Sequence, residues 1–238
     1  MDLHDPRRNR LLACLPDKEW RRWKALLEPF DMPLGKVLYE SGAQQTSVYF
    51  PTTAIVSLLH MLRDGSTAEI ALVGFEGLVG VSVLMGGGST PSHAVVQSAG
   101  MGYRLRASDF KSEIERSTAV MHLMLRYMQA LITQMSQTAV CNRHHSLEKQ
   151  FGRWLLLSLD RLGGNEVVMT HELIANMLGV RREGITEAAL RLQAAGIIRY
   201  VRGHIWVLNR PKLEQRTCEC YRVVKAEYER LLPDRETN

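Results

Sequence analysis

The chain has 238 residues, of which 45% are hydrophobic and 23% charged, and its formal net charge is +5. This is the composition of a folded globular protein, which excludes a disordered or fibrous chain, and the length suffices for two domains of ordinary size. No apolar run approaches the roughly 20 residues of a membrane-spanning helix, and the N-terminus lacks the apolar stretch of a secretory signal, so we expect a cytoplasmic protein without membrane contact.

The chain begins with a helical segment and continues with short strands. Leucine and tryptophan side chains recur at helical spacing from Asn9 to Phe30. Near the middle, Pro16 marks the start of a second helical stretch. Between Met32 and Leu105, turns rich in glycine separate short apolar runs at residues 37–39, 48–50, 55–59, 68–72 and 94–97. Many short strands of this kind predict a compact β-barrel or sandwich.

A long helix is predicted from about Ser108 to Arg143, where the pattern is helical and contains no turn residue. Near one face of it lie Val120, Leu123, Met124, Tyr127, Leu131, Met135 and Thr138. We interpret this stripe as the seam of a two-stranded dimer, and the alternative is an ordinary helix in the core of its own chain. A further amphipathic helix is predicted over residues 146–162, closed by Gly163.

The segment from Thr170 to Leu208 carries the most specific pattern. A helix is predicted from His171 to Leu178, a turn at Gly179 and a second helix from Arg181 to Ala195. A helix-turn-helix needs a small residue where its helices pack, here Ala175, and a glycine where the turn requires positive φ. Any helical hairpin with a glycine turn shares this spacing, so the two helices alone leave both interpretations open.

The residues around these helices favour a winged helix. Two alternating runs, 197–201 and 204–208, flank the tight turn Arg202-Gly203, and a short run at 166–169 precedes the first helix. In this order the second helix can enter the major groove of DNA while the hairpin turn reaches the backbone. The charge agrees, because residues 143–238 hold 16 lysines and arginines against 12 acidic residues.

Arginines at the start of the second helix are the leading candidates for contacts with bases. Arg181 and Arg182 carry guanidinium groups that can pair with guanine, and Glu183 can accept from cytosine or orient Arg182. Residues before the first helix and on the wing can meet phosphates. The candidate DNA-binding set is Thr170, His171, Arg181, Arg182, Glu183, Thr186, Glu187, Arg202 and His204. The alternative for each is a solvated surface side chain.

The order of these elements resembles that of the Crp/Fnr superfamily of bacterial regulators over nearly the whole chain. Segments 34–39, 47–51, 70–74 and 76–80 look like strands and glycine turns of that family's β-roll, and Arg182-Glu183 matches the start of its recognition helix. The resemblance implies an α+β chain with a cyclic-nucleotide-binding-like β-roll at 1–107, a dimerisation helix at 108–143 and a winged helix-turn-helix at 144–238. It also implies a homodimer that regulates transcription, binds double-stranded DNA at a pseudo-palindromic operator and has RNA polymerase as a further partner.

Some positions depart from the family pattern. Glu187 stands where many members carry a base-contacting arginine, which implies a different operator. Val81 follows Gly80 where cyclic-AMP-binding members have glutamate, and residues 91–94 contain no arginine. Because both groups that hold the nucleotide are missing, the resemblance implies a small-molecule effector other than cyclic AMP, or none. Cys14 stands alone, without the cysteine cluster of the iron–sulfur members.

Cysteines and histidines are the remaining candidates for a sensing site. The four cysteines are too few and too scattered for a disulfide framework, so we expect reduced thiols. Cys218 and Cys220, together with Cys141 and the pair His144-His145, are possible metal ligands or redox groups, but Cys-x-Cys is a weak signal and two small helix residues explain it as well. His93 is a possible haem or anion ligand, with a surface or core histidine as the alternative. We therefore assign no metal and no cofactor.

An enzyme is not expected, because the chain has no phosphate-binding loop, nucleophile elbow, zinc-protease motif or dinucleotide fingerprint. We assign no catalytic residue. The remaining alternative is a ligand- or redox-sensing signalling module whose winged helix binds protein. The salt dependence of binding distinguishes the DNA-binding regulator from the protein-binding module. DNA binding weakens steeply as the salt concentration rises, and an apolar protein contact does not.

Overall fold

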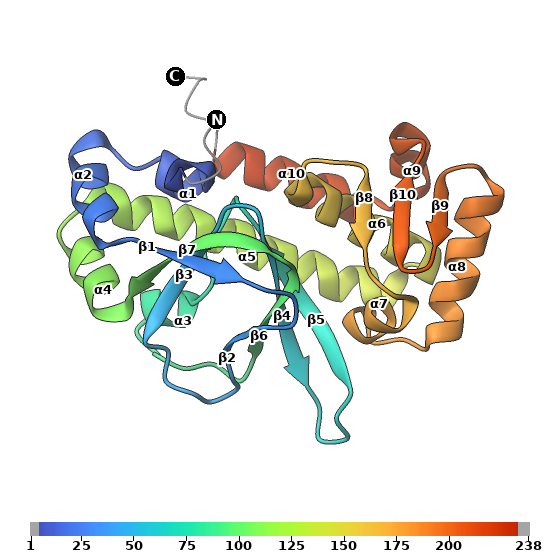
Figure 1. The fold of residues 1–238 in the computed structure, drawn as a ribbon, viewed down its shortest axis with the longest axis horizontal. Coiled ribbons are helices and arrows are strands. Elements are labelled where there is room, and N and C mark those ends of the chain that lie inside the picture. Colours follow the sequence, from blue (N-terminus) through green and yellow to red (C-terminus); the bar gives the residue numbers. More distant parts are fainter. Residues whose placement is uncertain (1–4, 233–238) are drawn as a thin grey trace.

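The computed structural model describes residues 5–232 and contains a β-rich N-terminal part, a long helix and a C-terminal helix-turn-helix with a small sheet (Figure 1). The β-roll and the C-terminal sheet lie toward opposite ends of the long helix α5 (Figure 1). The α+β class and this order of parts agree with the prediction. The boundaries at residues 107 and 143 stay predictions. Within the described residues no helix is long and apolar enough to cross a membrane.

Three short helical segments open the described chain, namely η1 (Pro6–Arg8), α1 (Arg10–Ala13) and α2 (Asp17–Leu26). The Asn9 side chain accepts from the backbone of α1 and donates to Pro51 O and Gly77 O, at 2.9 and 2.7 Å. The prediction that the helical segment extends to Phe30 is wrong, because Phe30 lies in strand β1 (Glu28–Met32). Pro29 explains this, since proline has no N–H for a helix and holds the residue before it in an extended conformation.

The β-roll consists of two antiparallel sheets with strand orders β1-β7-β3 and β2-β6-β4-β5. Their other members are β2 (Val37–Tyr39), β3 (Ser47–Pro51), β4 (Ile55–Met61), β5 (Thr67–Val73), β6 (His93–Ser98) and β7 (Gly100–Arg106), and the short helix α3 (Val81–Leu84) lies between β5 and β6. All five predicted runs are strands. Strands β1 and β7 were not predicted. In β7 glycine interrupts the apolar alternation, and Gly102 is required because a Cβ there would come within 2.8 Å of Phe50 O.

The predicted long helix is in fact two helices, α4 (Ala107–Glu115) and α5 (Thr118–His144). Ser117 interrupts them with an extended backbone, and its hydroxyl donates to Glu19 of α2 at 3.3 Å. Serine is a preferred residue at such a helix start, but the contact with α2 joins residues far apart in the sequence. For this reason the pattern alone did not reveal the break.

The apolar stripe that we interpreted as a dimer seam packs inside its own chain. Its members Val120, Leu123, Met124, Tyr127, Leu131 and Thr138 are buried, and Met135 packs against the same core. A different face of α5 is exposed, with Leu125, Ile132 and Val140 at 51%, 56% and 47% exposure. The alternative of an ordinary core helix is therefore correct for the predicted stripe.

The C-terminal part begins with α6 (Leu147–Leu162) and ends with α9 (Arg210–Arg216) and α10 (Glu219–Leu231). Helix α10 packs along α5, and α9 packs against α6. Between them lie the helices and the sheet of the predicted winged helix. Thr67 Oγ1 at the start of β5 donates to Asn176 O at 3.2 Å, so the winged helix also rests on the β-roll.

Glu69 of β5 is a buried carboxyl group where the β-roll meets α5 and α6. Ser57 Oγ lies 2.6 Å from Glu69 Oε2 and 2.6 Å from Gln97 Oε1. A hydroxyl has one proton, so both contacts are satisfied when Glu69 is protonated and donates to Ser57. Burial raises the pKa of Glu69 from 4.5 to about 7.

Because of this carboxyl group, we expect the chain to lose stability as the pH rises toward neutrality. Because its folded pKa is raised, the folded chain binds the proton more tightly, and the free energy of unfolding falls as pH rises from 4.5 to about 7, by about 3 kcal/mol. Glu69→Gln keeps the hydrogen bonds without the charge, so we expect it to match the wild type at pH 5 and exceed it at pH 8. Urea unfolding at both pH values tests this, with the exposed Glu115→Gln as control. An unchanged pH dependence in Glu69→Gln would exclude this carboxyl group as the source.

Candidate functional site

Two helices, α7 (His171–Leu178) and α8 (Arg182–Ala194), form the predicted helix-turn-helix. Gly179 ends α7 in the left-handed region at φ +65°, and Val180 N donates to Ala175 O at 3.0 Å across the turn. Ala175 is buried between the helices. The first helix, the small residue and the glycine turn therefore agree with the prediction, and the second helix is one residue shorter at each end than predicted.

The wing is a three-stranded antiparallel sheet of β8 (Glu166–Val168), β9 (Ile198–Val201) and β10 (His204–Val207), in the order β8-β10-β9. Its hairpin turns at Arg202 and Gly203, with φ of +49° and +86°. Positive φ at both positions is the pattern of a two-residue type I′ turn. The turn exposes the Arg202 side chain at the tip of the wing.

Helix α8 buries one face and exposes the other. Ile185, Ala189 and Leu192 pack into the domain. Gly184 faces the start of α6, where a Cβ would come within 2.6 Å of Leu147 Cδ2. The open face carries Arg182, Glu183, Thr186, Glu187 and Leu190, which line a shallow hollow. The first turn of α8 is thus presented to solvent together with its charges.

The arginines of this surface are available for a ligand. Arg181, Arg182 and Arg202 are exposed, and none of them forms an ion pair within residues 5–232. Glu187 differs, because Arg191 one turn later donates to its carboxylate. Three unpaired cations lie at the start of α8 and at the wing tip, which is the distribution that a phosphate backbone attracts.

Thr170 and His204 flank the wing turn. Thr170 caps α7 by accepting from Leu173 N at 3.3 Å, and its methyl group lies near Gly203. His204 Nδ1 lies 2.6 Å from Glu166 Oε1, and its ring stacks on Trp206. Both side chains therefore have a partner within the domain while they remain partly or fully exposed beside Arg202.

His171 is buried, and Thr186 on the open face of α8 forms a hydrogen bond with it. His171 is 8% exposed, stacks on Tyr200 of the wing at 3.9 Å, and its Nδ1 lies 3.1 Å from Thr186 Oγ1. The Thr186 hydroxyl donates to Arg182 O, so its oxygen accepts from an Nδ1–H of His171. Burial, and then the charge of Arg182, lower the pKa of His171, which keeps the ring neutral at pH 7. The pair joins α7, α8 and the wing.

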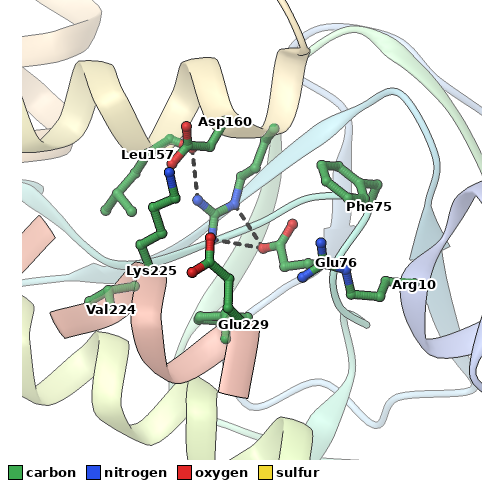
Figure 2. Close-up of a pocket in the computed structure, with 10 residues that line it drawn as sticks. Arg10, Phe75, Glu76, Leu157, Asp160, Val224, Lys225 and Glu229 are labelled. Carbon is green, nitrogen blue, oxygen red and sulfur yellow. Dashed lines mark hydrogen bonds and ion pairs between the residues drawn. The ribbon is translucent and has the colours of Figure 1, made fainter. Parts of the chain in front are cut away.

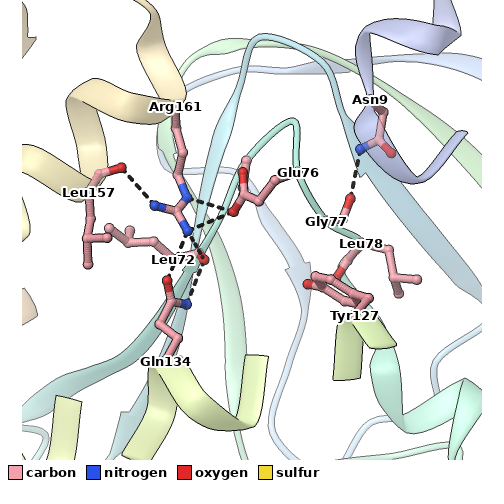
Figure 3. Close-up of polar contacts among 10 residues, drawn as sticks. Asn9, Leu72, Glu76, Gly77, Leu78, Tyr127, Gln134, Leu157 and Arg161 are labelled. Atoms are coloured by element: carbon pink, nitrogen blue, oxygen red, sulfur yellow. Dashed lines mark hydrogen bonds and ion pairs between the residues drawn. The ribbon is translucent and has the colours of Figure 1, made fainter. Parts of the chain in front are cut away.

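A buried ion pair that the sequence did not suggest connects three parts of the chain (Figure 3). Arg161 of α6 donates through Nε and Nη2 to Glu76 Oε1 at 2.8 and 2.7 Å, and both side chains are less than a tenth exposed. Its other hydrogen bonds reach Leu157 O, Leu72 O and Gln134 Oε1 of α5. The guanidinium group thus binds the β-roll, the long helix and the C-terminal part together.

The loop that carries Glu76 fits closely against the helices. A Cβ at Gly74 would come within 2.8 Å of the Arg161 side chain, and one at Gly77 within 2.5 Å of Tyr127. Tyr127 of α5 donates to Leu78 O at 2.8 Å (Figure 3). Glycine is needed at both positions because two elements approach the backbone directly. The relative position of the β-roll and α6 is therefore well defined.

A cavity of about 220 Å³ opens beside this ion pair (Figure 2). Its wall is mixed in charge and comes from α1, the loop after β5, α6 and α10, and includes Arg10, Phe75, Glu76, Asp160, Arg161, Lys225 and Glu229. The cavity lies where the β-roll, α6 and α10 meet. It is not lined by Gly80, Val81 or residues 91–94, the β-roll positions that were compared with a cyclic AMP site. There, Gly80 has φ +107° and is followed by α3, and His93 pairs with Glu40 at 2.7 Å.

Comparison with known proteins agrees with the fold and the helix-turn-helix. Residues 151–216 match the family of Crp-like helix-turn-helix domains. Comparison of the sequence with curated proteins found no significant match. Among solved structures, a protein from Eubacterium rectale described as a transcriptional regulator of the Crp/Fnr family is similar at 20% identity and a TM-score of 0.68, over 87% of this chain and 96% of that one.

Two further structures share the fold. FixK2 from Bradyrhizobium japonicum is 18% identical with a TM-score of 0.68, over 81% of this chain and 98% of that one. A transcriptional regulator of the CRP family from Thermus thermophilus is 17% identical with a TM-score of 0.67, over 79% of this chain and 95% of that one. The domain match identifies a Crp-like helix-turn-helix at residues 151–216, and the solved structures share the fold of the chain.

Proposed function

We propose that the chain is a sequence-specific DNA-binding regulator of transcription that acts as a homodimer on a pseudo-palindromic operator. The observation that carries this proposal is a set of exposed arginines at the start of α8 and at the wing tip, Arg181, Arg182 and Arg202, which form no ion pair with any residue between 5 and 232. The residues at the start of a recognition helix are those that contact base edges, and a wing reaches the neighbouring backbone. The match of residues 151–216 to Crp-like domains supports the same role.

Each candidate residue has a role in this proposal. Arg181 and Arg182 contact base edges, and guanine is the preferred partner because a guanidinium group can donate two parallel hydrogen bonds to it. Glu183 accepts a hydrogen bond from cytosine N4. Thr170, Arg202 and His204 meet phosphates around the wing. His171 and Thr186 act as positioning residues, because their hydrogen bond orients α8 against α7. Glu187 forms an ion pair with Arg191. We therefore expect the operator base that faces Glu187 not to be guanine.

The dimer is assigned to the exposed face of α5. Leu125, Ile132 and Val140 recur at intervals of seven and eight residues, which places them on one side of the helix. An apolar stripe of this kind is unusual on a surface that faces water. A two-fold axis along this face would pair each stripe with its copy and give the complex the symmetry of a pseudo-palindromic operator.

A charge in this stripe is expected to separate the subunits. In Ile132→Asp each carboxylate would face its symmetric copy, which costs about 3 kcal/mol, roughly a hundredfold in the dimer dissociation constant. Light scattering after size exclusion should then show the 27.0 kDa chain at micromolar concentration, and twice this mass for the wild type. Leu62→Asp places the same charge at an exposed leucine of the β4–β5 loop and should stay dimeric. A dimeric Ile132→Asp would exclude this face.

A small-molecule effector and a contact with RNA polymerase belong to the same proposal. The cavity of Figure 2 is where a small molecule would act on the junction, because the Arg161–Glu76 pair lines it and holds the C-terminal part. Because basic and acidic side chains balance in its wall, the cavity favours a neutral or zwitterionic polar ligand over the anion cyclic AMP.

The salt dependence of binding to a generic DNA duplex tests whether the partner is nucleic acid. Each phosphate contact contributes about −0.9 to the slope of log K against log salt concentration. We expect a steep negative slope, and Arg202→Asn should reduce its magnitude by about 2 in a dimer that loses two contacts. Asparagine tolerates the positive φ of this turn, so the hairpin is retained. Arg21→Asn on α2 is the control. A flat salt dependence would favour a protein partner for the winged helix.

A further inference from the structure

Four side chains of metal-binding type meet where α5 ends and α10 begins. Cys141 and His145 come from the last turn of α5 and the residue that ends it, and Cys218 and Cys220 from the start of α10. Three sulfur atoms and one imidazole nitrogen all lie within 4.8 Å of one another. The fold therefore brings together residues that lie 77 positions apart in the sequence.

The distances suit a tetrahedral site. Cys141 Sγ lies 3.5 Å from Cys218 Sγ, and Cys220 Sγ lies 3.6 Å from His145 Nδ1. With Zn–S of about 2.3 Å and Zn–N of about 2.0 Å, ligand atoms at the corners of a tetrahedron lie roughly 3.5–3.8 Å apart. The other pairs of ligand atoms also lie within 4.8 Å of each other, close to these tetrahedral edge lengths.

The environment of the cluster also fits a ligand set. The three cysteines are buried, yet they form a cluster separate from the main hydrophobic core. His145 Nε2 lies 3.4 Å from Glu219 Oε1, so a carboxylate lies behind the imidazole in the manner that orients histidine ligands of metals. Two small residues of a helix explain neither the histidine nor the carboxylate.

A buried positive charge lies next to the cluster. Three thiolates around a divalent ion leave a net negative charge, which needs compensation away from water. Arg153 of α6 is 4% exposed and donates to Thr138 Oγ1 at 3.1 Å, one helical turn before Cys141. Its guanidinium group would therefore stabilise an anionic metal site formed by these cysteines.

We infer that Cys141, His145, Cys218 and Cys220 bind a divalent cation of the zinc type in a closed, four-coordinate site. Sulfur ligands select soft or borderline ions over magnesium or calcium, and four protein ligands leave no open position for catalysis. The site lies directly before α6, which begins at Leu147, and links α5 to α10. A bound ion would fix the connection between the long helix and the winged helix. An effect of the bound ion on DNA binding rests on the proposed function, whereas metal uptake is independent of it.

Cobalt replaces zinc in such sites and reports their geometry. Full-length protein, kept reduced and stripped with a chelator, should take up one Co²⁺ per chain with the sulfur charge-transfer and visible bands of tetrahedral cobalt, and Zn²⁺ should abolish these bands. Cys218→Ser and His145→Ala should lose them, while Cys14→Ser and His144→Ala should bind as the wild type does. Glu219→Gln should keep the bands and lower the zinc affinity by about 10- to 100-fold.

The result separates this site from its alternatives. Absent cobalt bands in the reduced wild type, uptake that survives Cys218→Ser, or a Cys141–Cys218 disulfide as the only change on exposure to air would each overturn the metal site. DNA binding is measured on the same samples with and without Zn²⁺. Metal uptake without DNA binding would refute the proposed function alone, and DNA binding without metal uptake would refute the metal site alone.

Discussion

Arg182→Ala is expected to weaken binding to a selected operator by roughly 5- to 150-fold, the 1–3 kcal/mol that a bidentate arginine–guanine pair contributes. The side chain is exposed, lies in the first turn of α8 and has no ion pair within the described residues, so its truncation should leave the fold undisturbed. On the proposed function it removes only a contact with DNA. The thermal midpoint should therefore stay unchanged. Fluorescence anisotropy with labelled operator measures the affinity.

The lysine variant separates charge from geometry. Arg182→Lys keeps the positive charge but loses the planar fork, so it should relax the choice of base at one operator position while the salt slope stays the same. Arg21→Ala removes an exposed arginine of α2 and serves as control. Equal operator affinities of Arg182→Ala and Arg21→Ala would show that α8 does not read bases through this residue.

Glu76→Ala is expected to lower the free energy of unfolding by about 3–5 kcal/mol, because it leaves the Arg161 guanidinium buried without its counter-charge. This ion pair is almost completely removed from water and its arginine also serves backbone and side-chain acceptors of the β-roll and α5. The loss should appear in urea unfolding. It should be accompanied by a looser junction between the β-roll and α6, visible as faster hydrogen exchange there.

An exposed pair of the same chemistry supplies the control. Glu28 and Arg104 join β1 and β7 with side chains 44% and 41% exposed, and because solvent screens this pair, Glu28→Ala should destabilise the fold far less than Glu76→Ala. A double-mutant cycle of Glu76→Ala and Arg161→Ala should give a large coupling energy. If Glu76→Ala costs no more than Glu28→Ala, the buried pair does not hold the junction.

Local signals explain why the winged helix could be predicted well. Gly179 requires a left-handed turn, the hairpin turn at Arg202-Gly203 follows from two alternating runs, and both features are confined to a few neighbouring residues. The five strand runs of the β-roll carry the same kind of signal. Strands β1 and β7 do not, because Pro29 and the glycines of β7 break the apolar alternation.

Long-range packing explains the errors. Periodicity identified an apolar face of α5 correctly, but it could not show that the core of the same chain covers it and that Leu125 and Ile132 lie outside. Periodicity also could not show that Tyr200 of the wing stacks on His171 and leaves it 8% exposed, and the contact of His171 with DNA stays a prediction. The partner of Arg161 is also distant in the sequence, because Glu76 lies 85 residues away, so no local pattern indicates the pair.

The proximity of the cysteines is a further feature that the sequence alone could not reveal. The sequence contains Cys141, His145, Cys218 and Cys220, but their spacing does not reveal that α10 returns to the end of α5. Their proximity is a property of the fold, and it turns a weak motif into a set of four ligand atoms.

Selection of bound sequences from a random duplex library by the purified protein, repeated with Arg182→Ala, is the most direct test of DNA recognition by α8. We predict recovery of a site with two-fold symmetry and half-sites about one helical turn apart, with base preferences that weaken at one position of each half-site in the variant. Absence of any enriched sequence at low salt, or the same symmetric site with undiminished preferences in Arg182→Ala, would contradict it.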